Sequence, residues 1–458
     1  GWAQWARTTS LEYLLRTNFS KVDSQHFWDS MDAFPVESIE NAELKLLENT
    51  LHHYSIKMDS LFYDTTNFYT YINTTNSRCH VAKRGKNKQK RMDLRQIGLA
   101  LVVTRDDMIP LFHHSYEGNM NDAKVFSSVM QKIKDRLVAI GANVQNHTIV
   151  FDRGNNSKKN IELVESLDMK YVGALTPFHH KSLVEEASTL LEETMVNSRT
   201  IMAYRTSKNI WGQDMTVVVT ISDKLKEGQI RGIHTSLASC DAAISKLNRA
   251  VSSPKSKKRS REELERLVKS IISRYRVQTM IEFNVLEDDE KCYGINHTIK
   301  YDCLAKLEEE MGYRILMTNN HTWSTCEIIQ AYHGQSFIEN TFKNMKNQQH
   351  LSFNPQYHWT DQKIKVHNFC CVIAYLMTSL IYKTAREKGF AGSIDTLLDL
   401  LGNIRLGTII EDTGKKGKPK AVYKLEEMEP IERKLAEDLQ IMSLHESPMK
   451  LKGFGVYT

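Results

Sequence analysis

The feature that most constrains the fold is the order of strand-like and helix-like segments between residues 58 and 176. Three runs rich in aromatic and β-branched residues come first, and a turn at residues 105–107 separates the second from the third. A helical pattern, a short apolar strand, a second helix and a fifth strand follow. This β-β-β-α-β-α-β order predicts an α/β fold with a mixed five-stranded sheet flanked by helices.

Local patterns place these elements. Val125, Val129, Ile133 and Leu137 are four residues apart and form one face of a helix that we expect to begin after Asn121. Residues 155–157 (NNS) can cap the second helix, because their side chains accept hydrogen bonds from free backbone N–H groups. The strands are expected at residues 60–68, 96–104, 109–116, 147–152 and 170–176.

Outside this region the patterns are mostly helical. Residues 1–57 contain short amphipathic stretches, whereas residues 177–314 combine β-type pieces with a charged helix from about 238 to 276. Further helices are expected at 324–346 and 361–387. The apolar part of the last helix is shorter than the ~20 residues of a membrane span, so we expect a buried helix.

Composition narrows the class of protein. The 458 residues are 41% apolar and 25% charged with a net charge of +6, which is typical of globular proteins. The seven cysteines are irregularly spaced without a CxxC pair, so neither a disulfide framework nor a zinc site is expected. The nucleotide-binding and hydrolase motifs GxxxxGK[ST], GxGxxG, HExxH and GxSxG are missing from the sequence, and we expect no requirement for ATP.

Three acidic residues are candidates for chemistry. Asp64 lies inside an apolar strand, Asp152 ends a strand, and Glu339 lies within the helix expected at 324–346. Each also has a simpler explanation: a carboxylate at a strand edge, an Asx-turn, and a solvated helix face. Carboxylates that converge repel one another unless divalent cations neutralise them, and Mg²⁺ or Mn²⁺ accepts such oxygen ligands. Two such ions can catalyse phosphodiester transfer.

The spacing Tyr332-x2-Gln335-x3-Glu339-x6-Lys346 resembles the Tyr-Arg-Glu-Lys signature of DDE transposases from prokaryotic insertion sequences. The resemblance covers the chain from about residue 58 to the C-terminal helices. It is also carried by residues 61–66 (LFYDTT) around Asp64, residues 151–157 (FDRGNNS) around Asp152, and residues 110–122 between them.

The resemblance implies a ribonuclease H-like catalytic core that binds two Mg²⁺ (or Mn²⁺) ions through Asp64, Asp152 and Glu339. Such an enzyme hydrolyses a strand at a transposon end and joins the freed 3′-OH to target DNA. The implied partners are double-stranded DNA, with terminal inverted repeats and target sites, and a second copy of the chain in a homodimer. The implied location is the prokaryotic cytoplasm at the nucleoid, with no membrane.

The resemblance also implies a domain scheme, in which an insertion domain splits the core. The predicted parts are a helical N-terminal region (1–57), the first part of the core (58–176), an α+β insertion (177–314), the second part of the core with Glu339 (315–350), and a mainly helical C-terminal region (351–458).

One position departs from the signature. Gln335 stands where the family has Arg, and the family's Tyr, Arg and Lys hold DNA phosphates, which implies DNA contacts for Tyr332, Gln335 and Lys346. Glutamine lacks the charge and the bidentate fork of Arg, so phosphate affinity should fall. Either neighbouring cations compensate, or the activity is weakened.

Basic segments favour DNA as the partner. Residues 78–95 contain eight cations and one acid, and further basic groups lie at 255–261 and 415–420. Such segments are also common as solvated loops, and they carry no sequence specificity. In the first segment the predicted DNA-binding residues are Lys83, Arg84, Lys86, Lys88, Lys90 and Arg91.

Two alternatives stay open at this point. A ribonuclease H-like nuclease would cut DNA without joining it, and a weakened relic would bind DNA without cutting it, as Gln335 suggests. Sequence-specific recognition of ends is expected in residues 1–57 or in a segment upstream of Gly1. Trp211 is expected in a core, with stacking on a flipped base as its alternative role.

Overall fold

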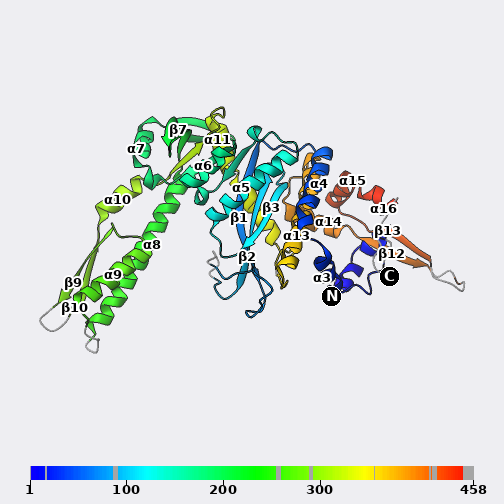
Figure 1. The fold of residues 1–458 in the computed structure, drawn as a ribbon, viewed down its shortest axis with the longest axis horizontal. Helices are drawn as coiled ribbons and strands as arrows, with labels where there is room; N and C mark the ends of the chain where they lie inside the picture. Colours follow the sequence, from blue (N-terminus) through cyan, green and yellow to red (C-terminus); the bar gives the residue numbers. More distant parts are fainter. Residues whose placement is uncertain are drawn as a thin grey trace. The chain divides into compact units, whose positions relative to one another are not determined.

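The structure is a computed structural model that describes residues 2–15, 18–85, 91–253, 259–287, 292–354, 356–411, 414 and 420–446 (Figure 1). The chain forms two compact units. The first consists of residues 1–173 and 331–458, and the second of residues 174–330. Strand β5 (Lys170–Leu175) and helix α11 (Thr325–His333) cross the two division points.

The first unit contains the predicted sheet, helices on both sides of it in the sequence, and a C-terminal hairpin. Its elements, besides β5 and the end of α11, are α1 (Trp2–Arg7), α2 (Leu11–Leu15), α3 (Ser24–Ala33), α4 (Glu37–His53), β1 (Ser60–Thr70), β2 (Arg95–Thr104), β3 (Pro110–Glu117), α5 (Asp122–Ala139), η1 (Val144–Asn146), β4 (Thr148–Phe151), η2 (Arg153–Asn155), α6 (Lys158–Ser166), α12 (Gln335–Lys346), α13 (Asp361–Glu387), α14 (Ile394–Asn403), β12 (Leu406–Glu411), β13 (Lys420–Leu425), α15 (Pro430–Asp438) and α16 (Ile441–Glu446).

The sheet of this unit has the order β3-β2-β1-β4-β5. Strand β1 pairs antiparallel with β2 and parallel with β4, while β2–β3 is antiparallel and β4–β5 is parallel. The sheet is therefore mixed, with β1 at its centre, and the segments that form it are those expected from the sequence. The predicted α/β class, with a mixed sheet flanked by helices, is confirmed.

Helix α5 packs against β3 through the apolar face that the sequence predicts. Val125, Val129, Ile133 and Leu137 are all buried, because a four-residue spacing places them on one side of the helix. Asn121 caps the helix by accepting a hydrogen bond from the N–H group of Ala123 (2.9 Å). Ser157 caps α6 in the same way, through the N–H group of Asn160.

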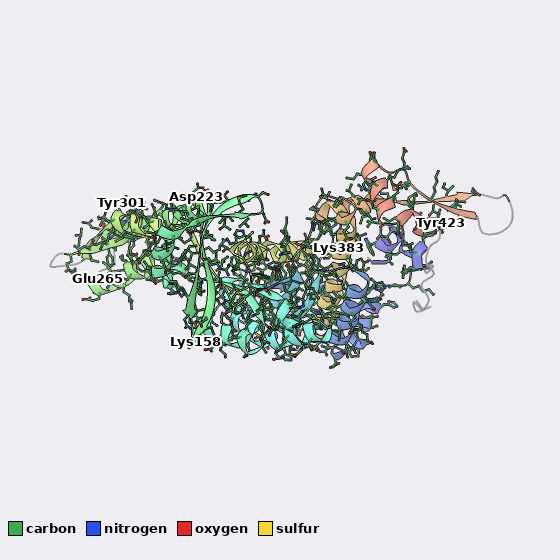
Figure 2. The ribbon with its side chains drawn as sticks, turned by 90° about the horizontal axis from the view of Figure 1, so that it is seen from above. Lys158, Asp223, Glu265, Tyr301, Lys383 and Tyr423 are labelled. Atoms are coloured by element: carbon green, nitrogen blue, oxygen red, sulfur yellow. The ribbon has the colours of Figure 1, made fainter. Side chains whose placement is uncertain are left out.

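Helix α13 begins and ends where the sequence predicts. By length and composition alone it could cross a membrane, but half of its most apolar window is buried and it packs on β3 and α3. Its polar side chains also face the interior of the unit: Asn368 donates to Ser115 (2.7 Å), and Lys383, labelled in Figure 2, pairs with Asp107 (3.1 Å). These contacts are those of a core helix.

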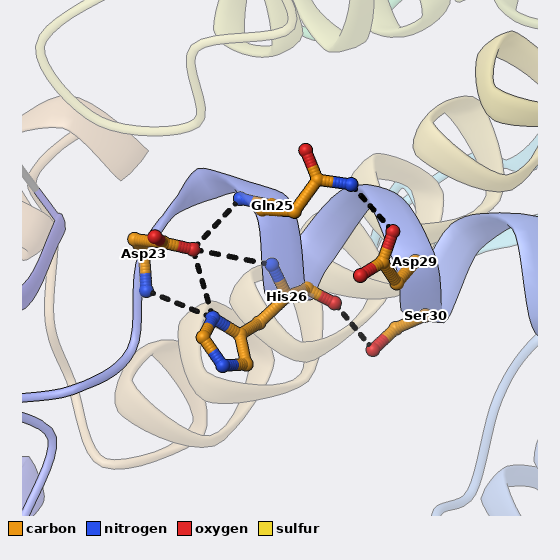
Figure 3. A network of polar contacts seen from close by, with 5 residues as sticks. All are labelled: Asp23, Gln25, His26, Asp29 and Ser30. Carbon is orange, nitrogen blue, oxygen red and sulfur yellow. Dashed lines mark hydrogen bonds and ion pairs between the residues drawn. The ribbon is translucent and has the colours of Figure 1, made fainter.

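Among the N-terminal helices, α3 begins at a capping side chain and α4 is attached to the sheet. Figure 3 shows the Asp23 carboxylate accepting hydrogen bonds from the N–H groups of Gln25 and His26 at the start of α3. Helix α4 is held by the buried Glu43, which pairs with His113 on β3 (2.6 Å) and Arg136 on α5 (2.7 Å). The helical N-terminal residues are thus joined to the core by a buried charge cluster.

The second unit combines long helices with antiparallel strands. Its elements, besides β5 and α11, are η3 (Pro177–His179), α7 (Lys181–Leu190), β6 (Glu192–Val196), β7 (Arg199–Ile210), β8 (Gln213–Ile221), α8 (Asp223–Ser252), α9 (Arg261–Tyr275), β9 (Ile281–Glu287), β10 (Cys292–Ile299), α10 (Tyr301–Glu309) and β11 (Tyr313–Thr318). The neighbouring strands β11, β8, β7 and β6 are antiparallel throughout. Apolar side chains of α8, α9, β9 and β10 form a core of their own.

Two predicted helices are wrong in detail. The segment expected to form one helix from 238 to 276 forms parts of two. Helix α8 starts earlier than expected, at Asp223, and ends at Ser252, and α9 follows from Arg261 to Tyr275. The helix expected at 324–346 is also two, α11 and α12, with Gly334 between them. A Cβ atom at Gly334 would lie 2.4 Å from the Phe62 ring of β1, so only glycine permits this close approach.

Other expectations have mixed outcomes. Trp211 is not a core residue: it is half-buried at the tip of the β7–β8 hairpin, where its φ of 55° and the 89° of Gly212 form a tight turn. The predicted basic groups at 255–261 and 415–420 lie mostly outside the described residues. The domain scheme stays a prediction, although both the second unit (174–330) and the expected insertion (177–314) interrupt the same core.

Candidate active site

Strand β1 presents Asp64 from the centre of the sheet. The strand pairs with β2 and β4, and Asp64 lies opposite Leu101 of β2, one residue beyond the last pair with β4. The side chain is half-buried, and its Oδ1 accepts a hydrogen bond from the N–H group of Thr65 (2.7 Å). A carboxylate in the middle of an otherwise apolar strand is costly, which is typical of functional positions.

Asp152 lies beside Asp64 because of the strand register. Strands β1 and β4 are parallel with Tyr63 opposite Phe151, and each aspartate is the next residue along its strand. Asp152 is exposed at the carboxyl end of β4, where ligands bind in α/β sheets, and its Oδ1 accepts a hydrogen bond from the N–H group of Arg153 (2.7 Å). It therefore also makes the local turn that the simpler explanation predicts.

Helix α12 carries Glu339 along β1. The Phe337 ring of the helix lies 6.0 Å from the Phe62 ring of the strand, and Lys346 Nζ donates to Thr66 Oγ1 (2.5 Å). Lys346 also lies over the Phe68 ring, 5.2 Å from its centroid. These contacts orient the face of α12 that carries the predicted site residues.

Residues of β1, α5, α12 and the end of β4 line one open pocket of about 930 Å³. Of the six residues predicted to act in catalysis or at the phosphates, five line it: Asp64, Asp152, Gln335, Glu339 and Lys346. The complete lining, from β1, the start of α5, the end of β4 and α12, is Tyr63, Asp64, Thr65, Thr66, Asn67, Asp122, Asp152, Gln335, Ile338, Glu339, Phe342, Lys343 and Lys346.

Tyr332, the sixth, does not line the pocket. It is 9% exposed and belongs to α11, whereas Gln335 and Glu339 belong to α12. Gly334 lies between the two helices. Its predicted contact with DNA stays a prediction.

The predicted basic loop is described only in part. Lys86, Lys88 and Lys90 lie outside the described residues. Lys83 pairs through its backbone with Gln96 (N–H to O, 3.0 Å), and Arg91 forms an ion pair with Asp93 (2.8 Å). Arg84 Nη2 donates weakly to Thr74 Oγ1 (3.4 Å). Lys83, Arg84 and Arg91, the members of the loop that the structure describes, do not line the carboxylate pocket.

Eight pocket residues had no role in the sequence-based prediction, and three of these, Asp122, Lys343 and Tyr63, bear on its chemistry. Asp122 opens α5 and adds a fourth carboxylate, and Lys343 adds a second cation beside Lys346. Lys343 follows Glu339 by four residues, so helical periodicity could have identified it. Asp122 and Tyr63 could not be identified as pocket residues from the sequence, because whether they line the pocket depends on how the elements pack.

Tyr63 is a buried polar side chain that faces this negative pocket. It is 1% exposed, and its hydroxyl has no hydrogen-bond partner among the described residues. Burial, together with the negative charges of Asp64 and Asp122, holds the pKa of Tyr63 well above its ordinary value. The phenol therefore stays protonated and can donate a hydrogen bond into the pocket. Gln335 Nε2 is a second buried donor without a partner in the described chain.

The donor set matches a divalent cation in its chemistry. Four carboxylates around one pocket supply the hard oxygen ligands that Mg²⁺ or Mn²⁺ prefers, and Tyr63 leaves a hydroxyl oxygen without a partner. Within the described residues, no three His, Cys, Asp or Glu side chains are already close enough together to hold one ion.

Comparisons with known proteins assign a family. No curated protein matches the chain in sequence. The chain is similar to a solved structure, the cryo-EM structure of a piggyBac transposase synaptic complex with hairpin DNA, at 7% identity and a TM-score of 0.36, over 74% of this chain and about half (51%) of that chain. The family assignment rests on sequence alone: residues 57–377 match the model of the transposase DDE domain. The chain belongs to the DDE transposase family.

Proposed function

We propose that this chain is the transposase of a prokaryotic insertion sequence of the group with the Tyr-Arg-Glu-Lys signature, and that it cuts and pastes DNA. The observation that carries the proposal is the pocket, in which Asp64, Asp152 and Glu339 meet from elements far apart in the sequence. The family match includes all three residues and supports a polynucleotide substrate.

In this proposal Asp64, Asp152 and Glu339 hold two Mg²⁺ or Mn²⁺ ions, with Asp122 adjacent. Bound divalent ions activate the attacking oxygen and stabilise the leaving oxygen in phosphodiester transfer. In the first step water attacks the phosphorus at the transposon end, and the bond to the 3′ oxygen breaks. In the second step the freed 3′-OH attacks a phosphodiester of the target, and a target 3′ oxygen leaves.

The remaining pocket residues position the scissile phosphate. Lys346 is fixed by Thr66 and Phe68, and Lys343 is exposed without a side-chain partner in the described chain. The Gln335 amide and the Tyr63 hydroxyl can each donate a hydrogen bond to phosphate oxygen. Lys343 thus supplies part of the charge that Gln335 lacks. Outside the pocket, the basic residues 83–91 would contact the DNA backbone.

The proposal extends to partners and location. Double-stranded DNA with terminal inverted repeats is the first substrate and target DNA the second. A homodimer is expected because two transposon ends must be brought together. The place of action is the nucleoid in the prokaryotic cytoplasm, without ATP.

The test is cleavage of DNA that carries the element's terminal repeats, in the presence of Mg²⁺. The parent chain should cleave, and Asp64→Asn, Asp152→Asn and Glu339→Gln should each remove activity while leaving DNA binding intact. Glu437→Gln, an exposed acid on α15, is the matched control and should cleave as the parent does. Cleavage that survives all three site substitutions would reject the assignment.

One alternative is a ribonuclease H-like nuclease that cuts without joining. A pre-cleaved end with a free 3′-OH separates the two enzymes, because only a transposase joins it to a second DNA. Joined product supports transposition, and cleavage without joined product supports the nuclease.

A further inference from the structure

Two exposed tyrosines lie just beyond the end of β1. Tyr71 is 51% exposed and Tyr357 is 60% exposed, and their ring centroids are 5.5 Å apart with 34° between the planes. The backbone fixes this arrangement: Thr70 forms a parallel bridge with Gln356, and the Tyr71 N–H group donates to the Gln356 carbonyl (2.9 Å). The two rings are therefore held in place while their outer surfaces stay open to solvent.

Positive charge surrounds this pair. Arg91 is close enough to Tyr71 and to the half-buried Tyr69 to interact electrostatically with both. Arg84 reaches Thr74 Oγ1 (3.4 Å), and Arg95 donates to the Thr74 carbonyl (2.6 Å) on the same connection. Asp93 pairs with Arg91, and Asp361 accepts hydrogen bonds from the N–H groups of His80 and Val81, so three arginines stand against two carboxylates in this region.

Exposed aromatic faces beside cations are typical of sites for unpaired nucleic-acid bases. Every base has a face that stacks on an aromatic ring, whereas the faces of paired bases inside a duplex are covered by their neighbours. The arginines can contact the phosphates between stacked bases. A purely apolar protein partner would gain nothing from this charge.

The pair is continuous with the carboxylate pocket through β1. Asn67 is the last residue of the strand to line the pocket, and Tyr71 follows four positions later. At ~3.3 Å per residue this is about 13 Å. Nucleotides stacked ~3.4 Å apart would cover that distance in about four steps.

We propose that Tyr71 and Tyr357 form a stacking platform for an unpaired DNA base about four nucleotides beyond the edge of the carboxylate pocket at Asn67. The platform rests on the proposed function, because it requires DNA in the neighbouring pocket. With this platform, the protein should bind DNA ends with separated strands more tightly than fully paired duplex.

The test compares two DNA ligands with the full chain, in EDTA so that nothing is cleaved. One is a duplex with a four-nucleotide unpaired strand, and the other is the same duplex fully paired. Tyr71→Ala and Tyr357→Ala should each weaken binding of the unpaired ligand about 5- to 150-fold, the effect of losing one stacked base. Binding of the paired ligand should stay within about twofold.

Matched controls keep the test decisive. Tyr71→Phe and Tyr357→Phe retain the ring and should bind as the parent does. Tyr301→Ala removes a tyrosine of similar exposure (69%) from the second unit and should have no effect. A fluorescent base analogue in the unpaired strand should be quenched by the parent and by the Phe variants but not by the Ala variants.

Several results would overturn the platform. One is an equal loss of affinity for both ligands in the Ala variants, and another is quenching that the Ala substitutions leave unchanged. A third is unchanged DNA affinity with a loss of self-association, which would assign the tyrosine pair to contact with a second copy of the chain. The outcome is separable from the proposed function. If the parent cleaves DNA with Mg²⁺ and the Ala variants still bind unpaired DNA normally, only the platform fails. If unpaired DNA is bound through the tyrosines but never cleaved, only the proposed function fails.

Discussion

The first unit contains two groups of charged side chains that differ in how their charge is balanced. Glu43, His113 and Arg136 have side chains that are 6–8% exposed, and the carboxylate contacts the histidine at 2.6 Å and the guanidinium at 2.7 Å. Asp64, Asp152 and Glu339 instead line an open pocket with Asp122, and the cations there are Lys343 and Lys346.

The difference separates a structural group from a functional one. A buried carboxylate is stable only when its charge is compensated by partners, and Glu43 has two. In the pocket, four carboxylates face two lysines, so the negative charge exceeds what the described side chains neutralise. Such an excess costs stability and is retained where a ligand compensates it. The first group attaches α4 to the sheet, and the second is left open for chemistry.

Breaking the buried group should have the largest effect on stability. Glu43→Gln keeps the shape of the side chain but leaves the buried Arg136 without a charge partner. We expect the free energy of unfolding to fall by about 3–5 kcal/mol, which urea denaturation followed by circular dichroism would measure. Asp152→Asn in the pocket is the contrasting variant and should change stability by less than about 1 kcal/mol. Equal effects of the two substitutions would contradict the comparison.

The pH dependence of the same variant gives an independent check. Burial raises the pKa of Glu43, but His113 and Arg136 together lower it below the usual 4.5. A carboxylate with a lowered pKa stabilises the fold above pH 4.5, and this contribution is lost as the pH falls through the folded-state pKa. Burial also lowers the pKa of His114 to about 4, which weakens the fold in acid in parent and variant alike. The difference between parent and Glu43→Gln should therefore shrink below pH 4.5.

Divalent metal should stabilise the folded protein by binding in the carboxylate pocket, and the gain should be smaller than the loss caused by Glu43→Gln. At a Mg²⁺ concentration of 100 times the Kd, the gain in the parent is expected to be about 2.7 kcal/mol, visible as a higher thermal midpoint that EDTA reverses. The double variant Asp64→Asn with Asp152→Asn should show no gain, and its metal-free midpoint should equal or exceed that of the parent. A gain of the same size in the double variant would place the metal elsewhere.

The cations of the pocket should have the smallest effect. Lys343→Met should weaken DNA binding uniformly across sequences and lower the slope of log K against log salt by about 1. Gln335→Arg should strengthen DNA binding and raise this slope by a similar amount. Lys159→Met removes an exposed lysine of α6 outside the pocket and should leave the slope unchanged.

The same pair of variants examines the relic alternative. If the parent binds DNA but does not cleave it, and Gln335→Arg does cleave, then Gln335 marks a weakened enzyme. Cleavage by the parent that Lys343→Met reduces would instead show that Lys343 compensates for the missing arginine.

Much of the local structure could be predicted because its signals lie between near neighbours. The burial of Val125, Val129, Ile133 and Leu137 follows from a four-residue spacing, and α13 begins after Thr360, whose hydroxyl accepts from the N–H group of Lys363. The order of strands and helices was likewise sufficient to predict that these segments form a mixed sheet in an α/β fold. The DDE positions were identified from ordered motifs, and their catalytic roles stay predictions.

Only the tertiary structure decided what meets in space. The parallel register that pairs Tyr63 with Phe151 places Asp64 beside Asp152, and no pattern within either segment specifies that register. Gly334 lies between two helices where periodicity alone predicts one, and the Phe62 ring approaches it too closely for a larger residue. The partners of Glu43 lie on β3 and α5, far along the chain. Spacing along one element determines which residues share a face, but packing between elements determines which faces meet, and the pocket and the tyrosine platform both depend on that packing.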